Sequence, residues 1–421
     1  MSEWISGLFL ILVVVFILYL RGTFHRQVKY RMKDIPSFND PHFPLAMMGV
    51  SASAIASGNV QNFWYEIDRI YAARLEAIRR ARRTIHFETF FMTPGRRADE
   101  FADALIERSQ AGVEALVIVD SVGANSIPKP YWRRLRARGV NVRFFHPLNW
   151  KYPLNFNNRT HRKLMLIDGK IAFVGGMGIS DRWDGMPAIG DTAPWLDCEV
   201  SFTGPIVAIL EGIFMQHWLY VGGVASLSQE IFRLSKDGST TIIVTPSDNP
   251  TDSSPVCALF YTNIRAAKKR IWLASPYFLP DKNTRSALVN AKRNGIDVRI
   301  LTIGPHNDKS LVYYAVRERY RDLLAAGIEI NEYQPSMMHA KVLLIDDAFV
   351  STGSTNLDPR SLFLNDELHL SMVEPQLAKP VEEFFNWGWK KSDRISLQQW
   401  KKRHWWQRLL GQIVLIFRWQ L

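Results

Sequence analysis

The 421-residue chain contains only two cysteines, Cys198 and Cys257. Two thiols exclude a disulfide framework and any zinc site built on cysteine ligands. The sequence also lacks a P-loop, a zinc-ligand helix and the GxSxG motif of serine hydrolases. A catalytic site would therefore have to be built from other residue types.

Acidic residues are outnumbered, with 40 Asp and Glu against 52 Lys and Arg, so the net charge is +12. A hydrophobic fraction of 47% excludes a disordered chain and a polytopic membrane protein, and the length favours two or three domains. Fourteen Trp and 24 Phe accompany the positive charge. This mixture suits a membrane surface at least as well as a nucleic acid.

One long apolar run is present near the N-terminus, from Trp4 to Leu20. At about 1.5 Å per residue it predicts roughly 26 Å of helix, just enough to cross a bilayer core. Basic residues follow the run, which disfavours a secretory signal and places the remainder of the chain in the cytoplasm. We therefore expect a single-pass transmembrane anchor at residues 1–22 and a basic juxtamembrane connector at 23–59. The alternative is a buried helix or a cleaved signal.

The rest of the chain contains an internal duplication. Three pairs of segments with matching patterns occur in the same order: 78–87 with 264–273, 104–119 with 287–303, and 135–142 with 323–330. Helix, glycine and strand alternate in them, as in α/β layers with largely parallel sheets. We therefore predict two homologous α/β/α halves, 60–225 and 240–395, joined by a polar linker at 226–239.

Each half carries the same polar motif in an otherwise apolar strand. The two copies read His161-Arg-Lys163 and His339-Ala-Lys341. Residues two apart on a strand project from the same face, so each histidine stands beside its lysine. Packing gives no reason for an imidazole beside an ammonium at the end of a buried strand. We therefore interpret these four residues as catalytic.

Two histidines and two lysines can support phosphoryl transfer without a metal ion. The lysines can hold a phosphate-like transition state, as magnesium does in nucleotide kinases. One histidine can attack phosphorus, while the other protonates the leaving oxygen and later deprotonates the incoming alcohol. We therefore expect no metal and no other cofactor.

At these residues the chain resembles the phospholipase D superfamily, whose signature His-x-Lys-x4-Asp-x6-Gly-[Gly/Ser]-x-Asn is usually present twice. The second copy is complete, with His339, Lys341, Asp346, Gly353, Ser354 and Asn356. The first has His161, Lys163, Asp168, Gly175 and Gly176, but Gly178 replaces the asparagine. The resemblance covers roughly residues 60–390. It implies two phospholipase D-like α/β/α domains related by a pseudo-twofold axis, with one shared active site.

The remaining signature residues divide into two groups. Ser354 and Asn356 are candidate phosphate-binding residues by this resemblance. Asp168 and Asp346 stand among the candidate catalytic residues as signature members. Their place before turns nevertheless favours capping of those turns over contact with a substrate.

Within the superfamily the chain looks most like bacterial cardiolipin synthases, on stretches that include 85–91, 327–335 and 353–361. This resemblance implies a phosphatidyltransferase with a covalent phosphatidyl-histidine intermediate. It would join two phosphatidylglycerol molecules into cardiolipin and release glycerol, with His161 as the nucleophile. It also implies a carboxylate behind each histidine: Asp197 is expected to orient His161, and Glu367 to favour a protonated His339.

The expected partners are the cell (inner) membrane and anionic phospholipids, with phosphatidylethanolamine as the other candidate donor and no nucleic acid. The main alternative is a membrane-tethered phosphodiesterase of the same superfamily, either a phospholipid hydrolase or a nuclease. A nuclease should display basic residues and stacking aromatics along an open groove. A non-catalytic membrane-binding scaffold would have no need of two intact His–Lys pairs.

The C-terminal segment 396–421 combines basic residues with aromatic and aliphatic ones. Its apolar residues recur at helical spacing: Trp406, Leu409, Leu410, Ile413 and Phe417. Such a helix could lie in the headgroup region of a membrane or close the catalytic core. We predict the membrane-surface role.

Overall fold

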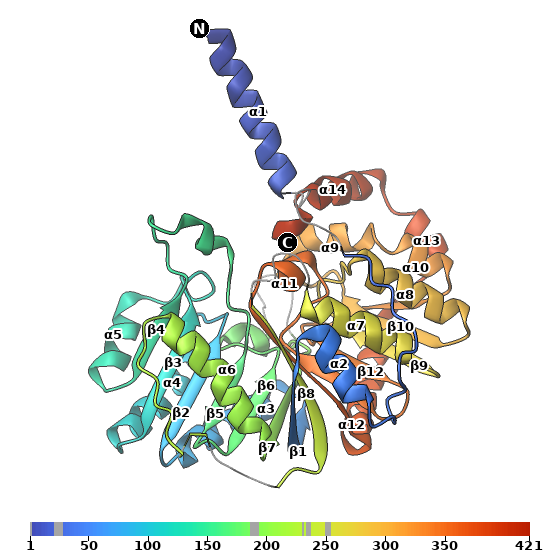
Figure 1. Ribbon diagram of the computed structural model, residues 1–421. Helices are drawn as coiled ribbons and strands as arrows, with labels where there is room; N and C mark the ends of the chain where they lie inside the picture. The colour runs from blue at the N-terminus through green and yellow to red at the C-terminus, as the bar shows by residue number, and fades with distance from the viewer. Residues whose placement is uncertain (1, 21–27, 186–192, 230, 233–236, 249–253) are drawn as a thin grey trace.

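The computed structural model describes residues 2–20, 28–185, 193–229, 231–232, 237–248 and 254–421 (Figure 1). The described strands form one 15-stranded sheet in the order β15-β11-β10-β9-β12-β13-β14-β8-β1-β7-β6-β5-β2-β3-β4. Those before residue 226 are β1 (Ala54–Trp64), β2 (Thr84–Thr89), β3 (Glu114–Asp120), β4 (Asn141–Phe145), β5 (Leu164–Ile167), β6 (Ile171–Gly175) and β7 (Glu199–Thr203). Those after it are β8 (Thr240–Ser247), β9 (Arg270–Ala274), β10 (Asp297–Ile303), β11 (Glu329–Tyr333), β12 (Val342–Ile345), β13 (Phe349–Gly353), β14 (Glu367–Val373) and β15 (Ser392–Ile395).

Helices precede, connect and follow these strands. They are α1 (Ser2–Leu20), α2 (Phe43–Ser51), α3 (Ile67–Arg80), α4 (Arg96–Gln110), α5 (Lys129–Ala137), α6 (Ile206–Tyr220), α7 (Pro255–Ala266), α8 (Lys282–Arg293), α9 (Ser310–Arg317), α10 (Arg321–Ala325), α11 (Pro359–Phe363), α12 (Pro375–Lys390), α13 (Leu397–Lys401) and α14 (Trp405–Ile416). Short 3-10 turns are η1 (Pro153–Asn157), η2 (Asp181–Asp184) and η4 (Arg418–Gln420).

The strand order repeats, in agreement with the duplication in the sequence. From the outside inward, β4-β3-β2-β5-β6-β7-β1 corresponds to β11-β10-β9-β12-β13-β14-β8. The outer three strands of each set are parallel, and the others pair antiparallel. At the centre, β1 pairs with β8 antiparallel, so the two repeats share one continuous sheet. The division into domains at 226–239 stays a prediction.

Apolar runs explain why the central strands are covered on both faces. All residues of β5 and β12 are buried. Alternate residues of β12 enter different hydrophobic clusters, Leu343 and Ile345 in one and Val342 and Leu344 in the other. The first cluster also contains residues of α3, α4, α5, α7 and α8, and the second contains residues of α6 and α12. A side chain on either face therefore gains about 1.5–3 kcal/mol from burial.

The predicted connector at 23–59 is wrong in its second half. It contains α2 and the start of β1, and residues 23–27 lie outside the described residues. Phe43 and Met47, four residues apart on α2, are both 1% exposed. Phe43 also packs edge-on against Phe349 of β13. Spacing of four places both side chains on one helix face, which is why this segment folds onto the body.

The predicted transmembrane anchor at residues 1–22 stays a prediction, and residues 1, 21 and 22 lie outside the described residues. Among the residues that the structure describes, no helix has the length and apolar character needed to cross a membrane. The helix α1 has 19 residues. It projects away from the sheet and contacts η4 at its base (Figure 1).

The C-terminal helix α14 packs on one side and is exposed on the other. It lies against α9, where a Cβ on Gly411 would come within 2.7 Å of the Tyr314 carbonyl oxygen. The opposite side exposes Trp405, Leu409 and Ile413. The helix therefore covers the second repeat, in line with the alternative that this segment closes the catalytic core. Its role at a membrane surface stays a prediction.

Candidate active site

The two His–Lys motifs lie immediately before β5 and β12 rather than inside these strands. Each is anchored through its backbone to the other repeat. The backbone N–H of His161 donates to the carbonyl of Asp366 at 2.8 Å, and that of His339 donates to the carbonyl of Leu196 at 2.7 Å. Short parallel bridges, Thr160 with Asp366 and Leu196 with Met338, accompany these bonds. Both histidines are therefore fixed where the two repeats meet.

A carboxylate from the opposite repeat holds each histidine. Nδ1 of His161 lies 2.9 Å from Oε1 of Glu367, and Nδ1 of His339 lies 2.7 Å from Oδ2 of Asp197. The predicted pairing, Asp197 with His161 and Glu367 with His339, is therefore wrong. The parallel bridges are the reason, because they bring the start of β14 beside His161 and the segment before β7 beside His339.

Burial and neighbouring lysines hold both imidazoles neutral. Burial, with the charges of Lys163 and Lys341, holds the pKa of His161 well below its usual value. Burial and Lys341 lower the pKa of His339 to about 4, although Asp197 opposes the shift. Both rings are thus available as bases when no substrate is bound.

The two carboxylates differ in charge. Burial raises the pKa of Glu367 to about 8, even though Lys163 opposes this shift. Burial acts in the same sense on Asp197, but there His339 and Lys341 overcome it and lower the pKa. His339 therefore faces an ionised carboxylate, whereas the partner of His161 is largely protonated near neutral pH.

The two lysines lie in the same buried space. Nζ of Lys163 donates to the carbonyl of His161 at 2.6 Å, and Nζ of Lys341 donates to the carbonyl of His339. Nζ of Lys341 is also 3.1 Å from Nε2 of His339. Burial lowers the pKa of Lys163 to about 7 and that of Lys341 to about 8. A bound anion would favour the charged form of both side chains.

The signature aspartates serve the backbone at the far ends of β5 and β12. The Asp168 carboxylate accepts N–H groups of residues 82–84 at 2.7–3.1 Å. The Asp346 carboxylate accepts those of residues 268–270 at 2.7–3.2 Å. They thus fix the loops that enter β2 and β9, whereas we expected them to cap the turns that follow.

Ser354 and Asn356, the candidate phosphate ligands, have different surroundings. The Ser354 hydroxyl donates to the Glu367 carboxylate and accepts the backbone N–H of Leu368 at 3.0 Å. Ser354 therefore positions Glu367, whereas we expected it to bind phosphate. Asn356 is 4% exposed, and its Oδ1 has no hydrogen-bond partner among the described residues. Because an amide oxygen only accepts hydrogen bonds, this atom is no phosphate ligand, and the expected role of the Asn356 amide N–H toward phosphate stays a prediction.

Gly178 stands where the family signature has asparagine, and the reason is steric. A Cβ at this position would lie 2.3 Å from the carbonyl oxygen of Phe91. That carbonyl accepts the backbone N–H of Ile179 at 3.0 Å, so the strand-like pairing fixes it in place. An asparagine would require the loop to move. The first repeat therefore contributes no amide equivalent to Asn356 at this position.

Three residues near the histidines lie outside the signature motifs, so the sequence analysis did not identify them. The Phe90 ring lies 5.3 Å from the His161 ring, and the Trp183 ring lies edge-on to His339 at 5.5 Å. Nε1 of Trp183 also donates to Asp197 at 3.0 Å. The charge of Lys309, which precedes α9, contributes to the low pKa of His161. Only the fold brings these residues to the site.

One group in the described part of the chain has the spacing of metal ligands. His217, Asp248 and Asp366 have ligand atoms within 4.8 Å of one another. The Arg162 guanidinium, however, donates to Asp248, and Nδ1 of His217 lies 2.6 Å from Glu88. Positive charge already balances these carboxylates, so we interpret the group as a partly buried ion-pair network beside the site.

Glu367→Gln is expected to change how stability depends on pH. The folded protein raises the pKa of Glu367 from 4.5 to about 8. The stabilisation linked to this proton is therefore fully present below pH 4.5 and is lost as pH rises toward 8. Between pH 5 and 8 the thermal midpoint of the wild type should fall relative to that of Glu367→Gln, as measured by calorimetry. A difference between the two proteins that stays constant over this range would contradict the assignment.

Comparisons with known proteins agree with the doubled motif. A family model described as "Cardiolipin synthase, PLD-like domain" matches residues 75–183 and 260–389, each with one His–Lys motif. Cardiolipin synthase A of Pseudomonas syringae is 32% identical over 341 residues, which cover 79% of this chain and 69% of the relative. The cardiolipin synthase of Alkalihalophilus pseudofirmus is 33% identical over 346 residues, covering 81% of this chain and 68% of the relative. The crystal structure of a phosphatidylserine synthase from Haemophilus influenzae matches with a TM-score of 0.68 at 14% identity, over 90% of this chain and 99% of that one. These matches confirm the predicted family, and the structural match confirms the α/β fold.

Proposed function

Because the chain belongs to the cardiolipin synthase family of phospholipase D-like proteins, we propose that it is a phosphatidyltransferase that makes cardiolipin. One observation carries the proposal. Two neutral histidines, each beside a lysine, are held by carboxylates of opposite repeats at one place. Transfer of a phosphatidyl group needs a nucleophile and a separate acid–base group at the same phosphorus atom.

In the first step, Nε2 of His161 attacks the phosphorus of phosphatidylglycerol. A P–N bond forms, and the P–O bond to the glycerol headgroup breaks. His339 takes up a proton when the anionic phosphate of the substrate binds beside it. It then gives this proton to the departing glycerol oxygen, and the ionised Asp197 stabilises the imidazolium before that transfer. Lys163 and Lys341 offset the charge that develops on the phosphoryl oxygens.

In the second step, a hydroxyl of another phosphatidylglycerol loses its proton to His339 and attacks the phosphorus. The P–N bond breaks, cardiolipin leaves, and His161 is restored as a neutral ring. Water in place of the alcohol would yield phosphatidic acid instead. Phe90 and Trp183, whose rings lie against the two histidines, would restrict the access of water to the intermediate.

Association with the cell membrane is part of the proposal. The substrates are lipids, and apolar side chains are exposed along α1 and on the outer side of α14. These helices lie at the same end of the molecule (Figure 1). Apolar side chains with neighbouring Lys and Arg suit the headgroup region of a bilayer.

The purified chain is expected to convert labelled phosphatidylglycerol in mixed micelles into cardiolipin and glycerol in equal amounts. A chelator should change the rate less than about twofold, because the two lysines supply the positive charge. Phosphatidylethanolamine added in a parallel reaction shows whether it serves as a second donor. Phosphatidic acid as the sole product would indicate a hydrolase, and cleavage of an added oligonucleotide without lipid turnover would indicate a nuclease.

A further inference from the structure

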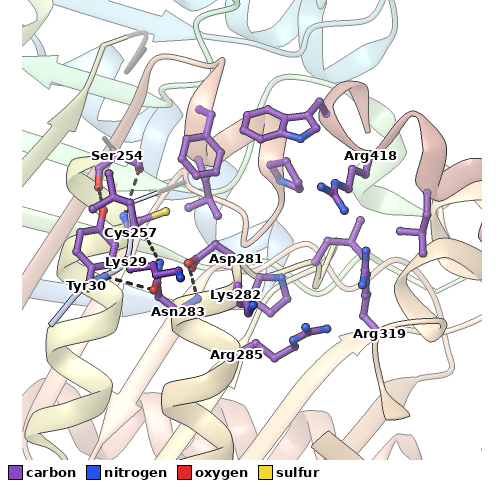
Figure 2. A pocket seen from close by; sticks show the side chains of 18 residues that line it. Lys29, Tyr30, Ser254, Cys257, Asp281, Lys282, Asn283, Arg285, Arg319 and Arg418 are labelled. Atoms are coloured by element: carbon purple, nitrogen blue, oxygen red, sulfur yellow. Dashed lines mark hydrogen bonds between the residues drawn. The ribbon is translucent and has the colours of Figure 1, made fainter. Parts of the chain in front are cut away.

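A cavity of about 360 Å³ lies away from the two His–Lys motifs, none of whose residues line it. Its walls come from residues 28–30, the start of α8, α11 and the C-terminal turn η4. In Figure 2 arginines lie on one side of the cavity and Tyr30, Ser254 and Cys257 on the other. The cavity is therefore a separate space, enclosed by elements from both ends of the chain.

Positive charge dominates this cavity. Five lining residues are basic and one is acidic: Lys29, Lys282, Arg285, Arg319 and Arg418 against Asp281. The carboxylate of Asp281 is already engaged, since it accepts the backbone N–H groups of Asn283 and Thr284 at the start of α8. Basic side chains thus outnumber acidic ones in the lining.

The three arginines of the lining lie near one another. Arg319 is half-buried, and burial together with the charges of Arg285 and Arg418 lowers the pKa of its guanidinium. Nε of Arg285 lies 3.2 Å from Asp322, so this neighbour has an acidic partner. Mutual repulsion of guanidinium groups is relieved by an anion between them, and phosphate oxygens match the donor geometry of arginine.

The rest of the wall is apolar. Leu279, Leu362 and Trp419 are 4%, 1% and 3% exposed, and Phe363 and Leu415 complete this side. A free phosphate ion would leave the partly exposed side chains of Phe363 and Leu415 facing water. A ligand with an acyl chain would cover them, at a gain of about 25 cal/mol for each Å² removed from water.

We propose that this cavity binds an anionic phospholipid as a second lipid site, separate from the reacting histidines. The phosphate lies at Arg285, Arg319 and Arg418, and part of an acyl chain lies along the apolar wall. The site is next to α14 and η4, and η4 contacts the base of α1. It thus lies at the end of the molecule where apolar side chains are exposed, which gives a lipid a direct route into it (Figure 1).

The proposal is tested with a phosphatidylglycerol that carries a diazirine on one acyl chain. The full-length chain is irradiated with this probe in zwitterionic detergent, and labelled peptides are identified by mass spectrometry. Peptides with Phe363 and Leu415 should be labelled in the wild type. Arg319→Gln should reduce this labelling roughly tenfold, which is typical of a lost charge-assisted bond. Labelling of peptides around the two histidines should stay unchanged, and this serves as the internal reference.

The matched control is Arg293→Gln, which removes an exposed arginine of α8 that does not line the cavity. This control should leave the labelling unchanged. If Arg319→Gln fails to fold, Arg285→Gln is used in its place. Equal labelling by a phosphatidylcholine probe would overturn the anionic specificity. Displacement of the label by inorganic phosphate as effectively as by unlabelled phosphatidylglycerol would show that the site takes a small anion, and would overturn the lipid assignment. Labelling that survives both arginine variants would overturn the site itself.

Discussion

His339→Ala is expected to trap a phosphatidyl adduct on His161, whereas His161→Ala is expected to form no adduct at all. Each change should lower cardiolipin synthesis by about 10²–10⁴-fold or more, because it removes an acid–base group or the nucleophile. The substrate for this test is a phosphatidyl ester of nitrophenol, because its leaving group needs no protonation. Intact-protein mass spectrometry detects the added phosphatidyl group, and peptide mapping locates it.

The charges around the two rings are the reason for this assignment. His161 lies beside a largely protonated Glu367, and His339 lies beside an ionised Asp197. A proton is therefore held more readily on His339, which leaves His161 as the neutral nucleophile. His404→Ala, a change at an exposed histidine, is the matched control and should retain full activity. An adduct on His339 in the wild type would reverse the roles.

Asp197→Asn is expected to behave like His339→Ala and to accumulate the His161 adduct. Its loss of cardiolipin synthesis should be roughly 10²–10⁴-fold, since the amide cannot stabilise the imidazolium of the acid–base group. Glu367→Gln should instead slow formation of the adduct, by about tenfold. The effect is smaller because Glu367 is largely protonated, so the substitution removes little charge. Quenched-flow sampling of adduct and cardiolipin distinguishes the two variants.

These two variants test the crossed pairing directly. If Asp197 served His161, Asp197→Asn would slow the formation of the adduct and Glu367→Gln would accumulate it. Asp347→Asn provides the control, because this exposed carboxylate pairs with Lys269 next to the second motif. It should leave both steps unchanged. Equal accumulation of adduct in Asp197→Asn and Glu367→Gln would contradict distinct roles for the two carboxylates.

The sequence by itself determined the repeated architecture and the pairs at its centre. Runs such as Leu164–Ile167 and Val342–Ile345 are apolar without alternation, and such strands are stable only when both faces are covered. A histidine and lysine two residues apart, placed before such a run, point into the protein together whatever surrounds them. Local spacing was sufficient for these features because strand geometry fixes the relation between near neighbours in the chain.

Only the tertiary structure decided which carboxylate holds which histidine. His161 and Glu367 are 206 residues apart, and the symmetry of the two repeats allows either pairing. The tertiary structure also decided the role of Ser354. The signature motif predicts that it binds phosphate, but in the fold its hydroxyl donates to Glu367. The position of β1 beside β8, which joins the repeats into one sheet, is likewise a long-range contact. Such contacts depend on which backbone segments meet across the two repeats, and local periodicity carries no information about that meeting.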